Sequence, residues 1–379
     1  MVRRMLIAFL FLLVSQAYAR ASDTLLFRGQ SSAWVNLNPN NKLPLWLGGR
    51  YIPQANYQIE LTGRKLIDFE ASANIRGSIG AHLFDTISTD AGLKPYRVWA
   101  RFSGRQFEVR LGLQKINFGS ASMLRPLMWF DQLDPRDPLQ LTDGVWALLG
   151  RYYFLNNANI WLWALYGNKG TKTWEIGKTI HHFPELGGRF QSPVPKGEAA
   201  FSYHFRKADV TGFGLTPPSY SITPEHRFAL DGKWDIGIGL WFESVWIHKS
   251  KPAGLISNQE ILNLGLDYTF ALGNGLNVVF EHLWITLDEK AFALNDVSSF
   301  SGLSLSYPLG LNNFISAIFY HDWTQNTQYN FMNWRRQFSR FSMYFMAYWN
   351  PLIYRMPQQD DTGQFFSGKG LQIMIVFNH

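Results

Sequence analysis

The stretch IDFEASANIRG, residues 67–77, decides which fold this chain can adopt. Apolar and polar side chains alternate along it, which is the period of a β-strand whose successive side chains point to opposite faces. The apolar face comprises Ile67, Phe69, Ala71, Ala73 and Ile75, and the polar face comprises Asp68, Glu70, Ser72, Asn74 and Arg76. The fold therefore depends on whether the apolar face meets a protein core or lipid.

The composition favours lipid. The chain has 379 residues, which exceeds a typical single domain unless that domain is a large barrel. Charged residues make up 17%, below the usual value of about 25%. Aromatic residues reach 16%, and such side chains gather at membrane interfaces. The absence of cysteine excludes disulfides, thiol catalysis and Cys-ligated metals.

The N-terminus predicts a secretory signal peptide over residues 1–21. Arg3 and Arg4 precede a short apolar run, and two small-x-small cleavage patterns follow, ending at Ala19 and Ala21. The apolar run is about half the ~20 residues that a spanning helix needs. Cleavage removes three of the 35 basic residues and none of the 28 acidic ones, leaving +4. This modest charge, without a basic run interleaved with aromatics, does not predict nucleic-acid binding.

Four further segments repeat the alternation: 96–102, 197–206, 261–270 and 340–349. In each, one face carries large apolar or aromatic groups and the other carries mainly polar or small ones. A β-sandwich of this length would divide into domains joined by linkers, and no linker is evident. The pattern therefore predicts that residues 22–379 form one all-β domain, a transmembrane antiparallel barrel in the outer membrane, surrounded by lipid and lipopolysaccharide.

The connections predict about eighteen strands, with sixteen as the alternative because the segments near 209–231 are weak. Short turns are expected on the periplasmic side at 61–65, 102–106, 156–159, 206–209, 231–234, 271–275 and 308–313. Longer extracellular loops are expected at 38–45, 81–93, 114–143, 168–196, 215–224, 249–258, 288–296 and 324–336. A turn at 350–351, a short strand at 352–356 and a last strand at 368–377 complete the count.

A barrel of sixteen to eighteen strands encloses an aqueous channel. The candidate charged lining residues on the strands are Asp68, Glu70, Arg76, Arg97, Arg101, Glu108, Arg110, Arg151, Glu198, Arg206, Asp267 and Arg340. Seven of these twelve are arginines, which favours anionic solutes because rings of charge set ion preference. The alternative is that these groups only solvate a wet wall and pair with one another.

The segment 115–144, KINFGSASMLRPLMWFDQLDPRDPLQLTDG, is too apolar for a solvated loop. We expect it to fold into the lumen and narrow the channel, since long loops are usually functional. Capping the barrel mouth or contacting a partner are the alternatives. Its charged candidates for the constriction are Arg125, Asp131, Asp134, Arg136 and Asp137.

The sequence VRLGLQKINFG at 109–119, followed by DPRDP at 134–138, resembles the alginate-export and related substrate-specific porins. The last strand, which reaches Phe377, resembles the C-terminal signal of outer-membrane barrels. The family resemblance implies eighteen strands and an arginine-rich conduit for an anionic polysaccharide.

The function expected is passive diffusion of small hydrophilic solutes, with anions or saccharides as candidates, and without enzyme activity, metal or cofactor. A lipid hydrolase is one alternative, because His248 and Ser250 have the spacing of a His-x-Ser element. His321 and Asp322 are neighbours on a strand and should point to opposite faces. His181 and the following histidine are expected to be loop residues and not metal ligands. The other alternative is a structural or adhesive barrel, and the oligomeric state stays open.

Overall fold

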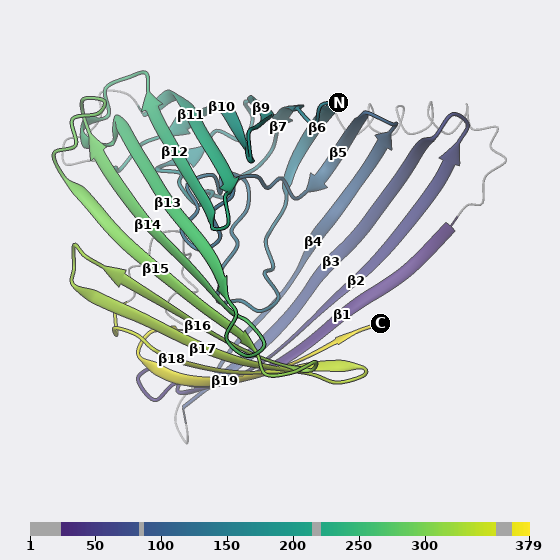
Figure 1. Cartoon of the computed structure of the whole chain (residues 1–379), viewed down its shortest axis with the longest axis vertical. Helices are drawn as coiled ribbons and strands as arrows, with labels where there is room; N and C mark the ends of the chain where they lie inside the picture. The colour runs from purple at the N-terminus through teal and green to yellow at the C-terminus, as the bar shows by residue number, and fades with distance from the viewer. Residues whose placement is uncertain (1–23, 83–86, 214–220, 354–365) are drawn as a thin grey trace.

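The chain forms a closed antiparallel β-barrel (Figure 1). The computed structural model describes residues 24–82, 87–213, 221–353 and 366–379, and the expected signal peptide at 1–21 lies outside them. The strands are β1 Thr24–Leu37, β2 Leu45–Leu61, β3 Lys65–Ala81, β4 Ile87–Ser103, β5 Phe107–Gln114, β6 Val145–Tyr153, β7 Asn159–Leu165, β8 Lys178–Thr179, β9 Glu185–Val194, β10 Gly197–Asp209, β11 Ile222–Asp235, β12 Gly239–Lys249, β13 Asn258–Phe270, β14 Leu276–Asp288, β15 Val297–Pro308, β16 Asn313–Asp322, β17 Thr327–Gln337, β18 Phe341–Trp349 and β19 Lys369–Asn378.

Eighteen of these strands build the wall. The other one, β8, is a two-residue segment inside a loop, and β7 pairs directly with β9. The last strand closes the barrel on the first, with Leu371 opposite Leu37. Closure pairs every edge, so the whole backbone ladder can lie in hydrocarbon. A 3-10 turn is present at Gly254–Ile256, and among the described residues no helix is long and apolar enough to cross a bilayer.

The alternation in the sequence becomes two faces of the wall. On β13, Leu262, Leu264 and Leu266 point outward and are exposed, whereas Asn263 between them is fully buried. The same contrast recurs around the barrel, and an exterior this apolar cannot face water. The outer face therefore contacts lipid, and a closed barrel with such an exterior is an outer-membrane architecture.

The stretch 67–77 lies on β3 and behaves as expected. Ile75 is exposed on the lipid side, and Asp68 faces the interior. On the neighbouring β4 the register shifts by one residue, because Ser72 pairs with Arg97 and Ala73 pairs with Pro95. This bulge accommodates a proline that has no N–H for the ladder, and it keeps the arginine on the inner face.

Two expected turns are wrong, since 206–209 belongs to β10 and 231–234 to β11. Arg206 and Asp231 point into the barrel from these strands. Polar residues mark chain reversals in soluble sheets, but they also line a wet barrel interior, so polarity alone misplaced the turns. The strand expected between residues 209 and 215 is likewise wrong.

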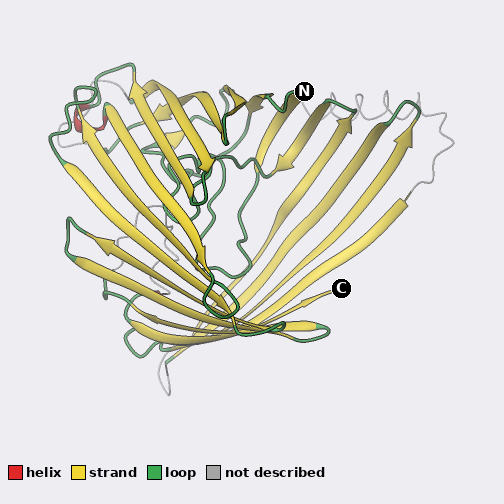
Figure 2. Ribbon diagram, in the orientation of Figure 1, coloured by secondary structure: helices red, strands yellow, loops and turns green. Residues whose placement is uncertain are grey.

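Three expected loops contain strand. The loop at 168–196 includes β9, the loop at 324–336 includes most of β17, and the loop at 81–93 includes the start of β4. The strand expected at 352–356 is absent at 352–353, and its remaining residues lie outside the described part. The total of eighteen is correct, although β9 and β17 were not expected as strands. Loops also lie inside the barrel, between its walls (Figure 2).

Candidate functional site

The inner wall divides into two parts that differ in exposure. On β9–β14, here called the sealed half, four inward polar residues, His204, Arg206, Glu243 and Glu281, have no exposed surface. On β2–β6, here called the open half, the side chains that form ion pairs are 11–59% exposed. Water therefore reaches one side of the lumen and not the other.

The segment 115–144 between β5 and β6, called loop 3, covers the sealed half. Its apolar residues merge with inward-facing side chains of the wall into one buried cluster. Phe118 stacks on Trp163 of β7 at a ring distance of 5.6 Å, and Trp129 packs edge-on against Phe118. This packing accounts for the apolar composition of loop 3.

Loop 3 is also bonded to the opposite wall. Glu281 of β14 accepts backbone N–H bonds from Ser122 and Leu124, both at 2.6 Å, and from Met123 at 3.1 Å. Glu243 of β12 accepts N–H bonds from two further residues of the loop. The backbone of loop 3 thus crosses from β5 to β12–β14.

A second segment, residues 166–184 between β7 and β9, is called loop 4. Its Trp174 Nε1 donates to the carbonyl of Arg125 in loop 3 at 2.8 Å. Its Glu175 lies 3.4 Å from Arg206 and 3.2 Å from Arg227. Burial would raise the pKa of Glu175, but Arg206 and two further cations outweigh burial and lower that pKa. Loop 4 is therefore anchored as an anion in the sealed half.

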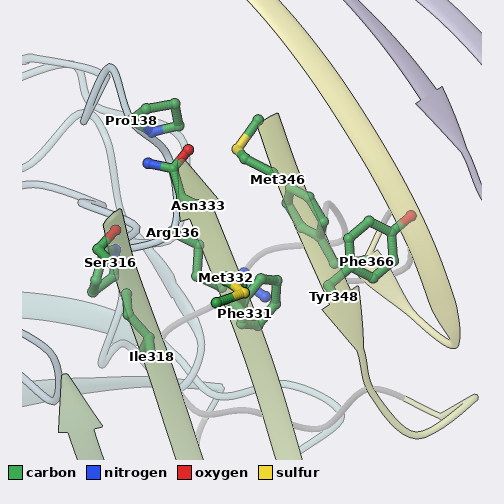
Figure 3. A pocket seen from close by; sticks show the side chains of 11 residues that line it. Arg136, Pro138, Ser316, Ile318, Phe331, Met332, Asn333, Met346, Tyr348 and Phe366 are labelled. Atoms are coloured by element: carbon green, nitrogen blue, oxygen red, sulfur yellow. The ribbon is translucent and has the colours of Figure 1, made fainter. Parts of the chain in front are cut away.

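The later part of loop 3 reaches the strands on the other side of the barrel. The guanidinium of Arg136 lies between the rings of Phe331 on β17 and Phe366 before β19, at 4.7 and 5.0 Å. Asp134 holds the same group at 2.6 Å. A cavity of about 50 Å³ beside Arg136, bordered by Tyr348, is visible in Figure 3. It has room for a few waters at most, so this contact fixes the loop and offers no solute site.

The open half carries a chain of ion pairs across four strands. Asp68 on β3 pairs with Arg101 on β4 at 2.8 Å, and Arg101 lies 3.4 Å from Glu108 on β5. Glu108 also pairs with Arg151 on β6 at 2.8 Å and lies 3.9 Å from Arg110. These five predicted lining residues are therefore brought together on the wet face, as the alternation requires.

Arg97 and Arg50 lie farther along the same wall. Arg97 donates to the carbonyl of Thr142 at the end of loop 3, at 2.8 Å, and Lys94 pairs with Asp143. Among the described residues, no carboxylate oxygen lies within 4.0 Å of either arginine. Arg50 was not among the predicted lining residues. It lies opposite Ser32 of β1, and its guanidinium carbon lies 5.8 Å from the centre of the Trp34 ring.

The remaining predicted lining residues are scattered. Glu70 lies on the open half, partly buried beside Ser72, and Arg76 pairs with Asp90 at 3.5 Å in exposed surroundings. Arg206 belongs to the sealed half. Two others lie apart from the ion-pair chain, at the exposed start of β10 and towards the end of β13: Glu198 and Asp267. Arg340 lies in the turn between β17 and β18 and is exposed.

The charged residues of loop 3 mainly serve the loop itself. Arg125 pairs with Asp131 at 3.3 Å, and both are buried. Asp137 accepts N–H bonds from Leu139 and Leu141. Burial raises the pKa of Asp131 and of Asp137. Glu243 and Glu281, which hold the loop to the wall, were not singled out from the sequence because isolated acids on strands look like any other lumen residue.

The alternative sites are not assembled. His248 Nδ1 lies 2.9 Å from Asn258 Oδ1, and within the described residues no hydrogen bond joins His248 to Ser250. His321 packs edge-on against Trp323, while Asp322 is buried on the other face. In the described part of the chain, no three His, Asp or Glu residues are grouped as a metal site.

No protein-family model and no curated protein sequence matches this chain. Solved structures of similar fold include OpdQ of Pseudomonas aeruginosa and OccAB4 of Acinetobacter baumannii. OpdQ has 8% identity and OccAB4 has 9%, and each has a TM-score of 0.53 and covers 94% of this chain and 98% of its own. An anion-selective porin from Comamonas acidovorans has 13% identity and a TM-score of 0.51, covering 94% and 100%. This likeness shows the fold, which is that of the porin-type outer-membrane barrels.

Proposed function

We propose that the chain is an outer-membrane channel through which small hydrophilic solutes diffuse passively, with a preference for anions. The observation that carries the proposal is the basic inner wall of β2–β6, which holds buried Arg97 together with the partly or fully exposed Arg50, Arg76, Lys94, Arg101, Arg110 and Arg151. Acidic groups balance part of this charge. Arg50 and Arg97 have no carboxylate within 4.0 Å in the described residues, so they supply positive potential to the lumen.

Loop 3 narrows the conduit in this proposal. It occupies the sealed half and returns along the open half, where Thr142 and Asp143 meet the basic wall. Asp143 is 58% exposed, so the passage runs between the arginines and the end of this loop. Small anions or short acidic saccharides fit such a passage, in keeping with the resemblance to substrate-specific porins. Lipopolysaccharide would surround the part of the barrel that lies in the outer leaflet of the membrane.

A structural or adhesive barrel has no need for a wet inner wall, and an enzyme needs converging catalytic groups. The exposed cations of β2–β6 favour the channel over both. We find no observation that favours either alternative specifically.

The test is the conductance of the refolded mature protein in a planar bilayer, with the reversal potential measured across a salt gradient. The proposal expects open channels whose reversal potential has the sign of anion selectivity. Folded protein that inserts and conducts no current would overturn it, and a cation-selective reversal potential would overturn the anion preference.

A further inference from the structure

We infer that Glu243 and Glu281 are positioning residues that hold loop 3 as a fixed partition across the lumen, so that solute passes only along the open half. This inference rests on the proposed channel function. The two carboxylates bind no solute, since both are fully buried beneath the loop.

Both carboxylate oxygens of Glu281 accept hydrogen bonds from one turn of loop 3. One carboxylate oxygen accepts from the backbone N–H and the hydroxyl of Ser122, at 2.6 and 3.1 Å. The other accepts from the N–H groups of Met123 and Leu124, at 3.1 and 2.6 Å. Asn263 on the neighbouring strand donates to the carbonyl of Leu124 at 2.7 Å. Successive N–H groups directed at one anion form a nest, which is a strong and oriented contact.

Glu243 holds the turns on either side. Its two oxygens accept from the N–H of Ala121 at 2.8 Å and from the N–H of Leu127 at 3.0 Å. Gly119 begins this turn with φ +95°, in the left-handed region. A Cβ added at Gly119 would lie 2.4 Å from Glu243 Oε1, so the loop sequence is shaped to this carboxylate.

Both residues must be carboxylates for this role. A glutamine in either place has one acceptor oxygen, and its amide would present N–H groups to the N–H groups of the loop. The buried donors left without a partner then favour release of the loop. Release uncovers the inner faces of β12–β14, which the partition otherwise keeps from the aqueous path.

The experiment compares Glu243→Gln and Glu281→Gln with the parent in planar bilayers. The matched control is Glu289→Gln, which removes an exposed carboxylate in the connection after β14, outside loop 3 and the candidate lining residues. Because the partition closes about half of the lumen, we expect each variant to raise single-channel conductance by up to roughly twofold. The control keeps the parental value.

A second readout does not require conductance. Since the chain has no cysteine, Ala121→Cys introduces a single reporter at a buried position of the loop. A water-soluble thiol reagent should label it about tenfold faster or more in the glutamine variants, because hydrogen bonds to charged groups are the stronger class. Gly119→Ala should accelerate labelling similarly, and it leaves the wall unchanged if a glutamine variant fails to fold.

The outcomes separate the two proposals. A parent that conducts, together with variants whose conductance and labelling both stay at parental values, overturns the partition. A parent that does not conduct overturns the channel, while faster labelling in the variants still supports the anchoring and unchanged labelling overturns it.

Discussion

Arg101 on β4 donates two hydrogen bonds to Asp68 on β3, at 2.9 and 2.8 Å, and so fixes the start of an ion-pair chain across the open half of the lumen. Such bidentate pairing orients the guanidinium and neutralises much of its positive charge locally. Arg50 and Arg97, on the same wet wall, have no carboxylate within 4.0 Å among the described residues. Substitution of either of these two arginines should therefore reduce the anion selectivity of the channel most directly.

Replacing Arg50 by glutamine should lower the anion-to-cation permeability ratio by about fivefold. A unit charge some 8 Å away in water contributes about 0.5 kcal/mol, favourable for an anion and unfavourable for a cation, so the two differ by about 1 kcal/mol. The reversal potential in a salt gradient measures the change. The shift should shrink as salt approaches 1 M, where the screening length is about 3 Å. Arg105→Gln, in an exposed periplasmic turn, is the control, and an equal shift there would refute a local role of Arg50.

Replacing Glu225 by glutamine should destabilise the barrel by about 3–5 kcal/mol, because it breaks a buried network. Glu225 bonds Arg206 at 2.6 and 2.9 Å and Arg227 at 2.9 and 3.0 Å, in the interior of the sealed half. Urea unfolding in detergent measures the loss. Arg76→Gln removes an exposed pair and should change stability by less than about 1 kcal/mol. Equal losses of stability in the two variants would contradict the burial of the Glu225 network in the sealed half.

Replacing Arg136 by alanine should release the later part of loop 3 from β17. Two aromatic contacts are lost, each worth about 0.5–2 kcal/mol. Lysine keeps the charge but not the planar stacking group, so Arg136→Lys should be intermediate. Chymotrypsin cleavage of loop 3 in the folded protein reports the release. If the alanine variant is as resistant as the parent, the contacts with Phe331 and Phe366 do not hold the loop.

Asp131 should give loop 3 a pH dependence. Burial raises the pKa of Asp131, although Arg125 and Lys115 oppose the shift. A carboxyl whose pKa is raised on folding destabilises the folded state at neutral pH, and this penalty fades as pH falls to the ordinary aspartate value of about 3.9. Asp131→Asn leaves Arg125 without its buried partner, so the test is the pH trend and not the absolute stability. The stability of the parent relative to Asp131→Asn should rise as pH falls from neutral towards that value. Denaturant unfolding across this range measures the difference, and a parent that loses stability relative to the variant in acid would contradict the prediction.

The sequence predicted the faces of the wall better than the ends of the strands. Leu264 and Asn263 occupy the expected sides because lipid and water impose opposite requirements on alternate residues. Arg206 and Asp231 were assigned to turns because a polar residue on a wet inner face and one in a turn have the same composition. The register shift at Pro95 depends on the partner strand and cannot be derived from one segment alone.

The sequence predicted the contacts of the site only where they follow from the alternation of inward and outward residues on neighbouring strands. The pairs of Glu108 with Arg101 and Arg151 join adjacent strands, so alternation brings them together. The bonds of Glu243 and Glu281 join β12 and β14 to a loop more than a hundred residues earlier. No spacing in the sequence encodes that contact, because it depends on the closure of the whole barrel.

The most direct test of the account is single-cysteine spin labelling from Phe69 to Arg76 on β3, in the otherwise cysteine-free chain reconstituted in bilayers. The account predicts that relaxation by oxygen, which partitions into lipid, is greatest at Ala71, Ala73 and Ile75. Relaxation by a water-soluble nickel complex should be greatest at the alternate positions, above all at Arg76, whose side chain is 47% exposed to the lumen. Uniform water access along the stretch, or oxygen maxima on the charged side, would contradict a lipid-facing exterior and a wet interior.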